Sequence, residues 1–156
     1  MAQTRGTEAL KAAGIAFTLH PYDYDPHAEK IGMAAAEALG IPPELALKSL
    51  MVEVDGKACC CVIPSPATLS MKKVAQAFGG KSAAMMAPAK AEKLTGYHTG
   101  GISPFGQRKA VPTAIDQSAS TAAQVWINAG QRGLLLSIDP VAAAQHLAAA
   151  FRDLTA

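Results

Sequence analysis

Short segments in which apolar and polar residues alternate recur along the chain, and this period of two predicts β-strands. Between residues 16 and 22, Phe17 and Leu19 alternate with Thr18 and His20. Residues 57–63 are apolar from the second position onward, which predicts a central strand covered on both faces. The same criteria predict further strands over residues 47–54, 82–86, 111–115, 124–128 and 134–138.

Helices are predicted where capping and stop signals bracket the segments between these strands. Ser70 is a suitable N-cap, and Pro88 and Pro140 suit the first turn of two later helices. Glycines follow several of these segments, as expected where a helix ends. The predicted helices cover residues 7–13, 33–39, 70–78, 89–94 and 140 to about 154.

The order of these elements predicts a mixed sheet. Asp55-Gly56 lies between strands 47–54 and 57–63 and is a strong signal for a tight antiparallel hairpin. The regular strand–helix alternation of a doubly wound parallel sheet is absent. We therefore expect an α+β fold over residues 1–156, a single domain in which helices surround a mixed, barrel-like curved sheet.

Composition narrows the function classes without naming one. Hydrophobic residues make up 50% and charged residues 17%, which suits a packed core and excludes disorder. Aromatic residues are only 5%, which argues against a domain that reads nucleic acid mainly by base stacking. The net charge of +2 leaves room only for a local basic face. Neither a signal peptide nor an apolar run of membrane-spanning length is visible, so we expect a cytoplasmic protein.

The cysteines and histidines do not suggest a metal or cofactor site. Cys59, Cys60 and Cys61 are consecutive, so neither a disulfide framework nor a zinc ligand set is indicated, and we expect buried thiols. The four histidines show no paired ligand spacing. Gly80-Lys81-Ser82 resembles the end of a phosphate-binding loop, but Ala75 stands where the first glycine is needed. No nucleophile elbow occurs.

Three features remain as candidates for chemistry. Lys48 shares the predicted apolar face of its strand with Leu50 and Val52, which is costly unless the amine meets an anion or polar partner, or reaches water past the strand end. The glycine-rich loop 95–106 could turn backbone N–H groups toward a ligand. The segment 128–133 is a second glycine-containing turn.

These features recur in one known family. The chain resembles the YbaK/ProX-type aminoacyl-tRNA deacylases, and most closely the branch that acts on Cys-tRNA(Pro), from residue 16 to the last helix. The strand lysine and the Gly-Gly-Ile-Ser-Pro stretch are the most specific of the shared motifs. The matching segments are Ala46-Leu47-Lys48-Ser49-Leu50, Thr95-Gly96-Tyr97, Gly100-Gly101-Ile102-Ser103-Pro104-Phe105-Gly106, Val111-Pro112-Thr113 and Gly130-Gln131-Arg132-Gly133.

The resemblance implies an editing enzyme that cleaves the ester between a mischarged amino acid and the 3′ end of tRNA. It implies Lys48 as the catalytic residue, no metal and no cofactor, the aminoacyl-tRNA acceptor end as substrate, and prolyl-tRNA synthetase as a partner. Substrate-binding positions are then expected at Tyr22, Ile31, Ser49, Gly100, Gly101, Ile102, Asn128 and Gly130.

The resemblance also implies a chemistry that needs no protein nucleophile. In the cysteine branch the substrate's own thiol attacks its carbonyl, whereas in alanine-specific relatives a positioned water attacks. Ile31, Asn128 and Leu135 depart from the cysteine-branch pattern, which carries an aromatic, a small hydroxyl and an acidic residue at the matching positions. Editing of Cys-tRNA(Pro), editing of Ala-tRNA(Pro) or another small-residue ester, and non-catalytic binding of tRNA or synthetase therefore remain alternatives.

Overall fold

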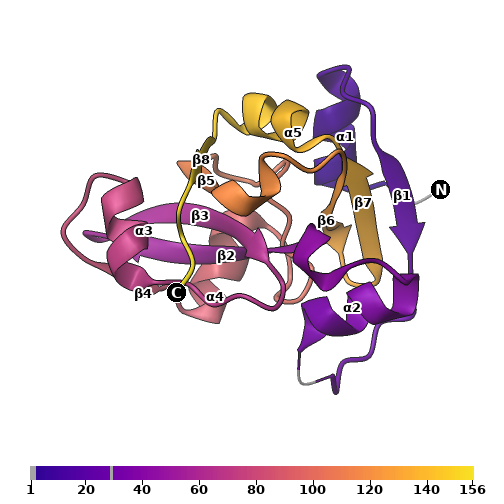
Figure 1. Ribbon diagram of the computed structural model, residues 1–156, viewed down its shortest axis with the longest axis horizontal. Helices are drawn as coiled ribbons and strands as arrows, with labels where there is room; N and C mark the ends of the chain where they lie inside the picture. The colour runs from indigo at the N-terminus through magenta and orange to yellow at the C-terminus, as the bar shows by residue number, and fades with distance from the viewer. Residues whose placement is uncertain (1–2, 29) are drawn as a thin grey trace.

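The computed structural model describes residues 3–28 and 30–156, which form one eight-stranded mixed sheet with helices around it (Figure 1). The longest of the described helices has 9 residues, so none of them is long enough to span a membrane. The helices are α1 (Arg5–Ala12), α2 (Ile31–Leu39), α3 (Met71–Ala77), α4 (Pro88–Thr95) and α5 (Pro140–Leu147), with 3-10 turns η1 (Pro43–Leu45) and η2 (Gln117–Ala119). The strands are β1 (Thr18–Pro21), β2 (Ala46–Val54), β3 (Lys57–Pro64), β4 (Ala83–Met85), β5 (Thr113–Asp116), β6 (Val125–Gln131), β7 (Leu134–Ile138) and β8 (Ala150–Arg152).

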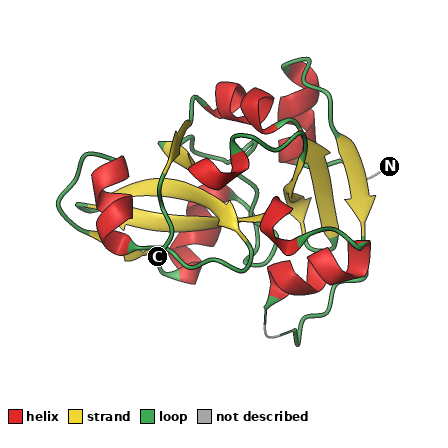
Figure 2. Ribbon diagram, viewed as in Figure 1, coloured by secondary structure: helices red, strands yellow, loops and turns green. Residues whose placement is uncertain are grey.

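The sheet is curved and open (Figure 2). Its strand order is β1-β7-β6-β2-β3-β5-β8, with β4 paired to β2 off this path. Antiparallel pairs β1–β7, β6–β7, β2–β3 and β2–β4 combine with parallel pairs β2–β6, β3–β5 and β5–β8. Helices α1, α2, α3 and α5 pack against β6, β2, β4 and β5 respectively. The predicted α+β class and mixed curved sheet are therefore confirmed.

Apolar side chains cover both faces of the central strands. One cluster contains Cys60, Val62 and Ile127, and the other contains Cys61 and Ile63. This alternation confirms that residues 57–63 form a central strand with two buried faces. The prediction for the neighbouring strand was incomplete, because the face opposite Val52 also contributes to the core: Met51 on that face is 3% exposed.

The hairpin signal at Asp55-Gly56 is confirmed. Both residues have positive φ, +50° and +79°, as the tightest hairpin turns require, and Val54 pairs with Lys57 across the turn. The segment 128–133 differs from its predicted turn. β6 continues to Gln131 through a bulge, since Asn128 pairs with Leu135 but Gln131 with Leu134. The irregularity re-aims the residues between them, as bulges beside binding sites often do.

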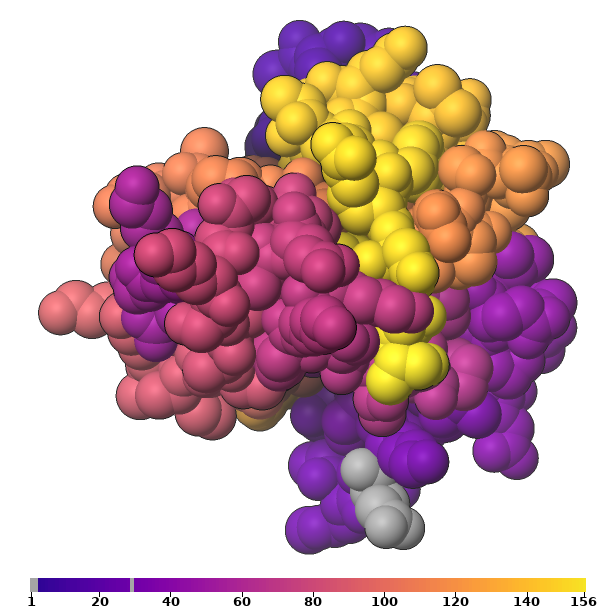
Figure 3. Space-filling model, turned by 60° about the vertical axis from the view of Figure 1, so that its left-hand side comes forward, coloured from indigo at the N-terminus to yellow at the C-terminus, as the bar shows by residue number. Residues whose placement is uncertain are grey.

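The last predicted helix ends earlier than expected. α5 stops at Leu147, Ala148 adopts φ +51°, and residues 150–152 form β8, parallel to β5. The alanine-rich sequence favours helix locally, but tertiary pairing overrides that preference. Leu154 is fully buried, its N–H donates to the Asp116 carboxylate at 3.1 Å, and its carbonyl accepts from Ser70 N–H at 2.9 Å. Figure 3 shows this C-terminal segment, in yellow, lying across one face of the molecule.

The docking of Leu154 leads to a stability prediction. Replacing Leu154 with Ala removes a fully buried side chain and should lower the free energy of unfolding by about 2–5 kcal/mol. Val141→Ala is the matched control, because Val141 is 45% exposed on α5 and its truncation should change stability by less than about 0.5 kcal/mol. Urea denaturation of both variants measures the difference, and equal losses would contradict the buried docking of the C-terminal segment.

Candidate active site

Two strands pair with the same edge of β2, one at its start and one at its end. The gap that they leave between them opens a site. β6 pairs in parallel with Ala46 and Leu47, and β4 pairs antiparallel with residues 52–54. Residues 48–51 therefore face neither strand along this edge. The only backbone contact there among the described loops is Met86 N–H donating to the Met51 carbonyl at 3.1 Å. A break of this kind gives a ligand access to backbone polar groups in the middle of a sheet.

A cavity of about 440 Å³, here called the central pocket, lies at this break. Residues from α2, the segment after β3, β4, α4 and β7 complete its walls, among them Met33, Ser65, Met85 and Leu135. No aspartate or glutamate of the described chain lines it. Its lining includes seven of the nine site residues expected from the sequence: Tyr22, Ile31, Lys48, Ser49, Gly100, Ile102 and Asn128.

Lys48 brings a positive charge into this pocket. Partial burial lowers the pKa of Lys48 below its usual range, and the neighbouring Lys30 charge lowers it further. None of the ion pairs formed within residues 3–28 and 30–156 includes Lys48. A desolvated ammonium without a carboxylate partner favours an anion or a carbonyl oxygen that gains negative charge.

Ser49 adds polar groups beside Lys48. Its Oγ is buried and has no hydrogen-bond partner among the described residues. The backbone N–H and carbonyl groups of consecutive strand residues point alternately to the two edges of the strand. The Ala46 carbonyl accepts from Ser65 N–H on the β3 side, whereas the Met51 carbonyl accepts from Met86 N–H on the opposite side. The N–H and carbonyl of Ser49 therefore lie on the open edge with those of Met51. Because the Ser49 Oγ is inaccessible, the groups of Ser49 that a ligand can reach on this edge are its backbone N–H and carbonyl.

Asn128 holds two walls of the pocket together. Its Oδ1 accepts hydrogen bonds from the N–H groups of Gly130 at 2.6 Å and Gln131 at 3.0 Å, which fixes the bulge of β6. Its Nδ2 donates to the Gly100 carbonyl at 3.4 Å. Asn128 thus ties β6 to the glycine loop while lining the central pocket.

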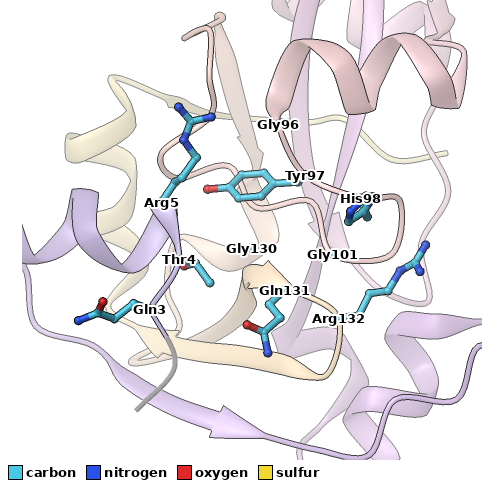
Figure 4. A pocket seen from close by; sticks show the side chains of 10 residues that line it. All are labelled: Gln3, Thr4, Arg5, Gly96, Tyr97, His98, Gly101, Gly130, Gln131 and Arg132. Carbon is cyan, nitrogen blue, oxygen red and sulfur yellow. The ribbon is translucent and has the colours of Figure 1, made fainter.

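Two expected site residues do not face the central pocket. Gly101 and Gly130 line a second cavity of about 460 Å³, which Figure 4 shows from close by. A Cβ on Gly101 would lie 2.8 Å from the backbone N of Arg132, so the loop packs against β6–β7 too closely for a side chain. We call this second cavity the arginine cavity; it is lined by Gln3, Thr4, Arg5, Gly96, Tyr97, His98, Gly101, Gly130, Gln131 and Arg132.

Sequence reasoning missed several walls of the central pocket. Met33 and Met85 are apolar residues on a helix and an edge strand, and they carry no sequence signal that separates them from core residues. The segment Ser65-Pro66-Ala67-Thr68 also lines the pocket, because it leaves β3 beside the start of β2. Only the proline after the strand hinted at a fixed turn there.

The expectation that the three cysteines are buried is confirmed. Cys59, Cys60 and Cys61 are all buried, and burial raises the pKa of Cys60 to about 12, so these thiols are inert. Gly80-Lys81-Ser82 resembles the end of a phosphate-binding loop in sequence. In the structure, the N–H groups of Lys81 and Ser82 donate hydrogen bonds to the Asp55 carboxylate. Within the described chain, no three His, Cys, Asp or Glu side chains gather as metal ligands.

Comparison with known proteins identifies the family. A family model described as an aminoacyl-tRNA editing domain matches residues 25–145. The chain belongs to the aminoacyl-tRNA editing domain family. It is 34% identical over 124 residues, 78% of this chain and 75% of the relative, to "Putative Cys-tRNA(Pro)/Cys-tRNA(Cys) deacylase EbsC" from Enterococcus faecalis. The resemblance predicted from the motifs and the aminoacyl-tRNA deacylase class are thereby confirmed.

Two solved structures show the same editing-domain fold. One, described as "a putative trans-editing enzyme for prolyl tRNA synthetase", has a TM-score of 0.85 at 23% identity and covers 97% of this chain and 95% of its own. The other, described as "hypothetical protein APE2540", has a TM-score of 0.87 at 21% identity and covers 98% of this chain and 100% of its own. At these identities the likeness establishes the fold of the editing domain.

The partial burial of Lys48 leads to a prediction about stability and pH. The charged amine of Lys48 is less favourable in the folded than in the unfolded chain. Lys48→Met should therefore leave the protein at least as stable at pH 7. The gain in the free energy of unfolding should stay below about 1 kcal/mol, because solvent still screens the amine. As pH rises through the lowered pKa toward 10.5, wild-type Lys48 loses its proton and the difference should shrink. Thermal unfolding at pH 7 and pH 10 measures this.

Lys72→Met is the control for that experiment, because Lys72 is exposed on α3. For Lys72→Met, the difference in melting temperature from wild type should be the same at pH 7 and pH 10. A marked loss of stability for Lys48→Met at pH 7 would show that Lys48 has a stabilising partner in the folded protein, against the unpaired charge described above.

Proposed function

We propose that this editing domain removes mischarged cysteine from Cys-tRNA(Pro) in the cytoplasm. The observation that carries the proposal is the unpaired Lys48 ammonium in the central pocket, beside the open edge of β2. The pocket holds one aminoacyl group and the terminal ribose, with the ester oxygens next to Lys48 and Ser49. Lys48 is the proposed catalytic residue, since its charge stabilises the oxygen that becomes negative when the carbonyl is attacked.

The nucleophile in this proposal comes from the substrate. The cysteinyl sulfur attacks its own carbonyl carbon, a C–S bond forms, and the C–O bond to the ribose breaks. The thiol proton ends on the departing ribose oxygen, and the products are free tRNA and a cyclic thioester that water then opens. The domain has only to hold the sulfur against the carbonyl, and such positioning can supply several kcal/mol of the barrier, on the order of 7–11 at best.

The other pocket residues are assigned to substrate binding. Tyr22, Ile31 and Ile102 form walls for the side chain of the amino acid, and Leu135 lies among them. Burial raises the pKa of Tyr22, so its phenol stays neutral and can donate a hydrogen bond. The carbonyl of Gly100, held by Asn128, lies where it can accept from the substrate amine.

Editing of Ala-tRNA(Pro) or another small-residue ester is the second candidate. The polar groups of Ser49 on the open edge favour it, because they could hold an attacking water next to Lys48. In either case, prolyl-tRNA synthetase is the proposed partner that would present the tRNA, in keeping with the description of one structural neighbour.

Deacylation assays test the substrate and the role of Lys48 together. Wild-type protein should deacylate Cys-tRNA(Pro) and spare Pro-tRNA(Pro), and Lys48→Ala should lower kcat/KM by about 10²- to 10³-fold because the developing oxyanion loses its charge partner. Lys72→Ala is the matched control and should keep wild-type activity, since Lys72 is exposed on α3.

Other results of the assay would change the assignment. Turnover of Ala-tRNA(Pro) alone would move the substrate to the second candidate while keeping the site. Binding of tRNA with no turnover of any charged species would contradict catalysis and make the chain a binding module. Activity of Lys48→Ala equal to that of wild type would remove Lys48 from the catalytic site.

A blocked thiol separates the two chemistries. S-methylcysteinyl-tRNA(Pro) is one methyl group larger and has no free sulfur nucleophile, so the proposed route predicts a loss of turnover of at least about 100-fold although the ester still binds. Single-turnover rates of both esters provide the comparison. A rise in the melting temperature of the protein on addition of each aminoacyl-tRNA checks that both ligands bind. Equal rates would exclude sulfur attack and indicate a water nucleophile.

A further inference from the structure

The arginine cavity lies directly behind the wall of the central pocket. His98 and Gly101 line the arginine cavity, whereas Thr99 and Gly100, between them in the chain, line the central pocket. β6 repeats this division, since Asn128 lines the central pocket and Gly130 the arginine cavity. Consecutive Cα atoms are about 3.8 Å apart, so the two cavities share a wall one or two residues thick. The two cavities are therefore close enough in space for one extended ligand that passes around this wall to contact both.

The charges in the arginine cavity all have one sign. Arg5 and Arg132 line it together with His98, and no carboxylate of the described residues is among its lining. Neither arginine takes part in an ion pair within the described ranges. Figure 4 shows the two arginines on opposite sides of the cavity, with Tyr97 and Gly130 between them. Guanidinium groups without carboxylate partners are well suited to bind phosphate oxygens.

Contacts with neighbouring groups restrict the side chains of both arginines. Arg132 Nε donates to the Thr99 carbonyl at 2.9 Å, and its guanidinium lies 5.5 Å from the centre of the Tyr24 ring. Arg5 packs so closely on Gly96 that a Cβ there would lie 2.8 Å from Arg5 Nη1. Fewer rotamers are lost on binding when side chains are already held, so ordering them costs less.

One carboxylate lies close by and has other partners. Glu92 accepts a hydrogen bond from Thr99 N–H at 2.7 Å and lies 3.7 Å from His98 Nδ1. The Thr99 N–H does most to lower the pKa of Glu92, with smaller contributions from His98 and Arg132. Glu92 thus fixes the wall between the two cavities from outside them, and it does not enter the lining of the arginine cavity.

We propose that the arginine cavity binds backbone phosphates of the single-stranded 3′ end of tRNA while the aminoacyl ester occupies the central pocket. This inference rests on the proposed function, because the central pocket defines where the 3′ end lies. Arg5 and Arg132 each contact a phosphate, and Tyr97, Gly101 and Gly130 line the cavity between them. The contacts carry no base specificity and serve to position the ester.

Binding of a 5′-labelled oligoribonucleotide ending in CCA, followed by fluorescence anisotropy, tests the proposal. Arg5→Gln and Arg132→Gln should each raise Kd by about 5- to 10-fold. The double variant should reduce the slope of log Kd against log salt concentration by about 1.4, because each single-strand phosphate contact contributes about 0.7. Arg152→Gln, at an exposed residue of β8, is the control with the same charge change and should bind as wild type.

Hydrolysis assays keep this proposal separate from the proposed function. The ratio of kcat/KM for aminoacyl-tRNA to that for the matching aminoacyl-adenosine ester, which has no phosphate, should fall at least about fivefold in the double arginine variant and stay at the wild-type value in Arg152→Gln. An active wild type whose arginine variants keep that ratio and bind the oligonucleotide normally would overturn the phosphate site alone. A wild type inactive on every ester would refute the proposed function.

Two further outcomes would also overturn the phosphate site. An equal loss of oligonucleotide binding in Arg152→Gln would show that only overall charge matters. Binding of inorganic phosphate in the arginine cavity, without binding of the oligonucleotide, would assign the cavity to free anions in place of tRNA.

Discussion

Strand β2 pairs with two strands of opposite direction along one edge, and the site depends on that constraint. β6 runs parallel to the start of β2 and β4 antiparallel to its end, so both strands point toward the break with their C-terminal ends and leave the edge of β2 before they meet. The backbone between them would lose hydrogen bonds if nothing entered the break. The central pocket is therefore built by main-chain topology, and side chains such as Lys48 and Asn128 only give it its chemical character.

The unpaired charge of Lys48 shows how this site differs from the rest of the fold. Some other lysines have carboxylate partners, as Lys90 does with Glu53 at 2.8 Å and Lys73 with Asp153 at 3.0 Å, and others, such as Lys72, are exposed to solvent. In the central pocket the structure keeps a partly desolvated ammonium without one. Retaining an unfavourable group where the chain could have used an apolar residue is typical of positions that are kept for function.

Local signals predicted most of the fold, and long-range pairing accounts for the differences. The Asp55-Gly56 hairpin and the strand after it, which is buried on both faces, could be predicted because their signals lie in neighbouring residues. The strand β8 was not, because an alanine-rich segment favours helix until β5 offers a parallel partner. Lys48 was found from its place on an apolar face, whereas the walls at Met33 and Met85 look like any core residues. The division of Gly100 and Gly101 between two cavities needed the three-dimensional path of the loop.

The C-terminal segment has a consequence for how the chain folds. β1 lies beside β7, and residues 154 and 156 bind the backbone around residue 69, so contacts join segments that are far apart in sequence. Folds of this kind close large loops before they gain stabilising contacts and are slow to form. During synthesis, β2 and β3 leave the ribosome well before β5 can pair with the edge of β3 and before Leu154 can pack on one of their faces. The newly made hairpin therefore passes through a period with an exposed apolar face, in which a chaperone could bind it.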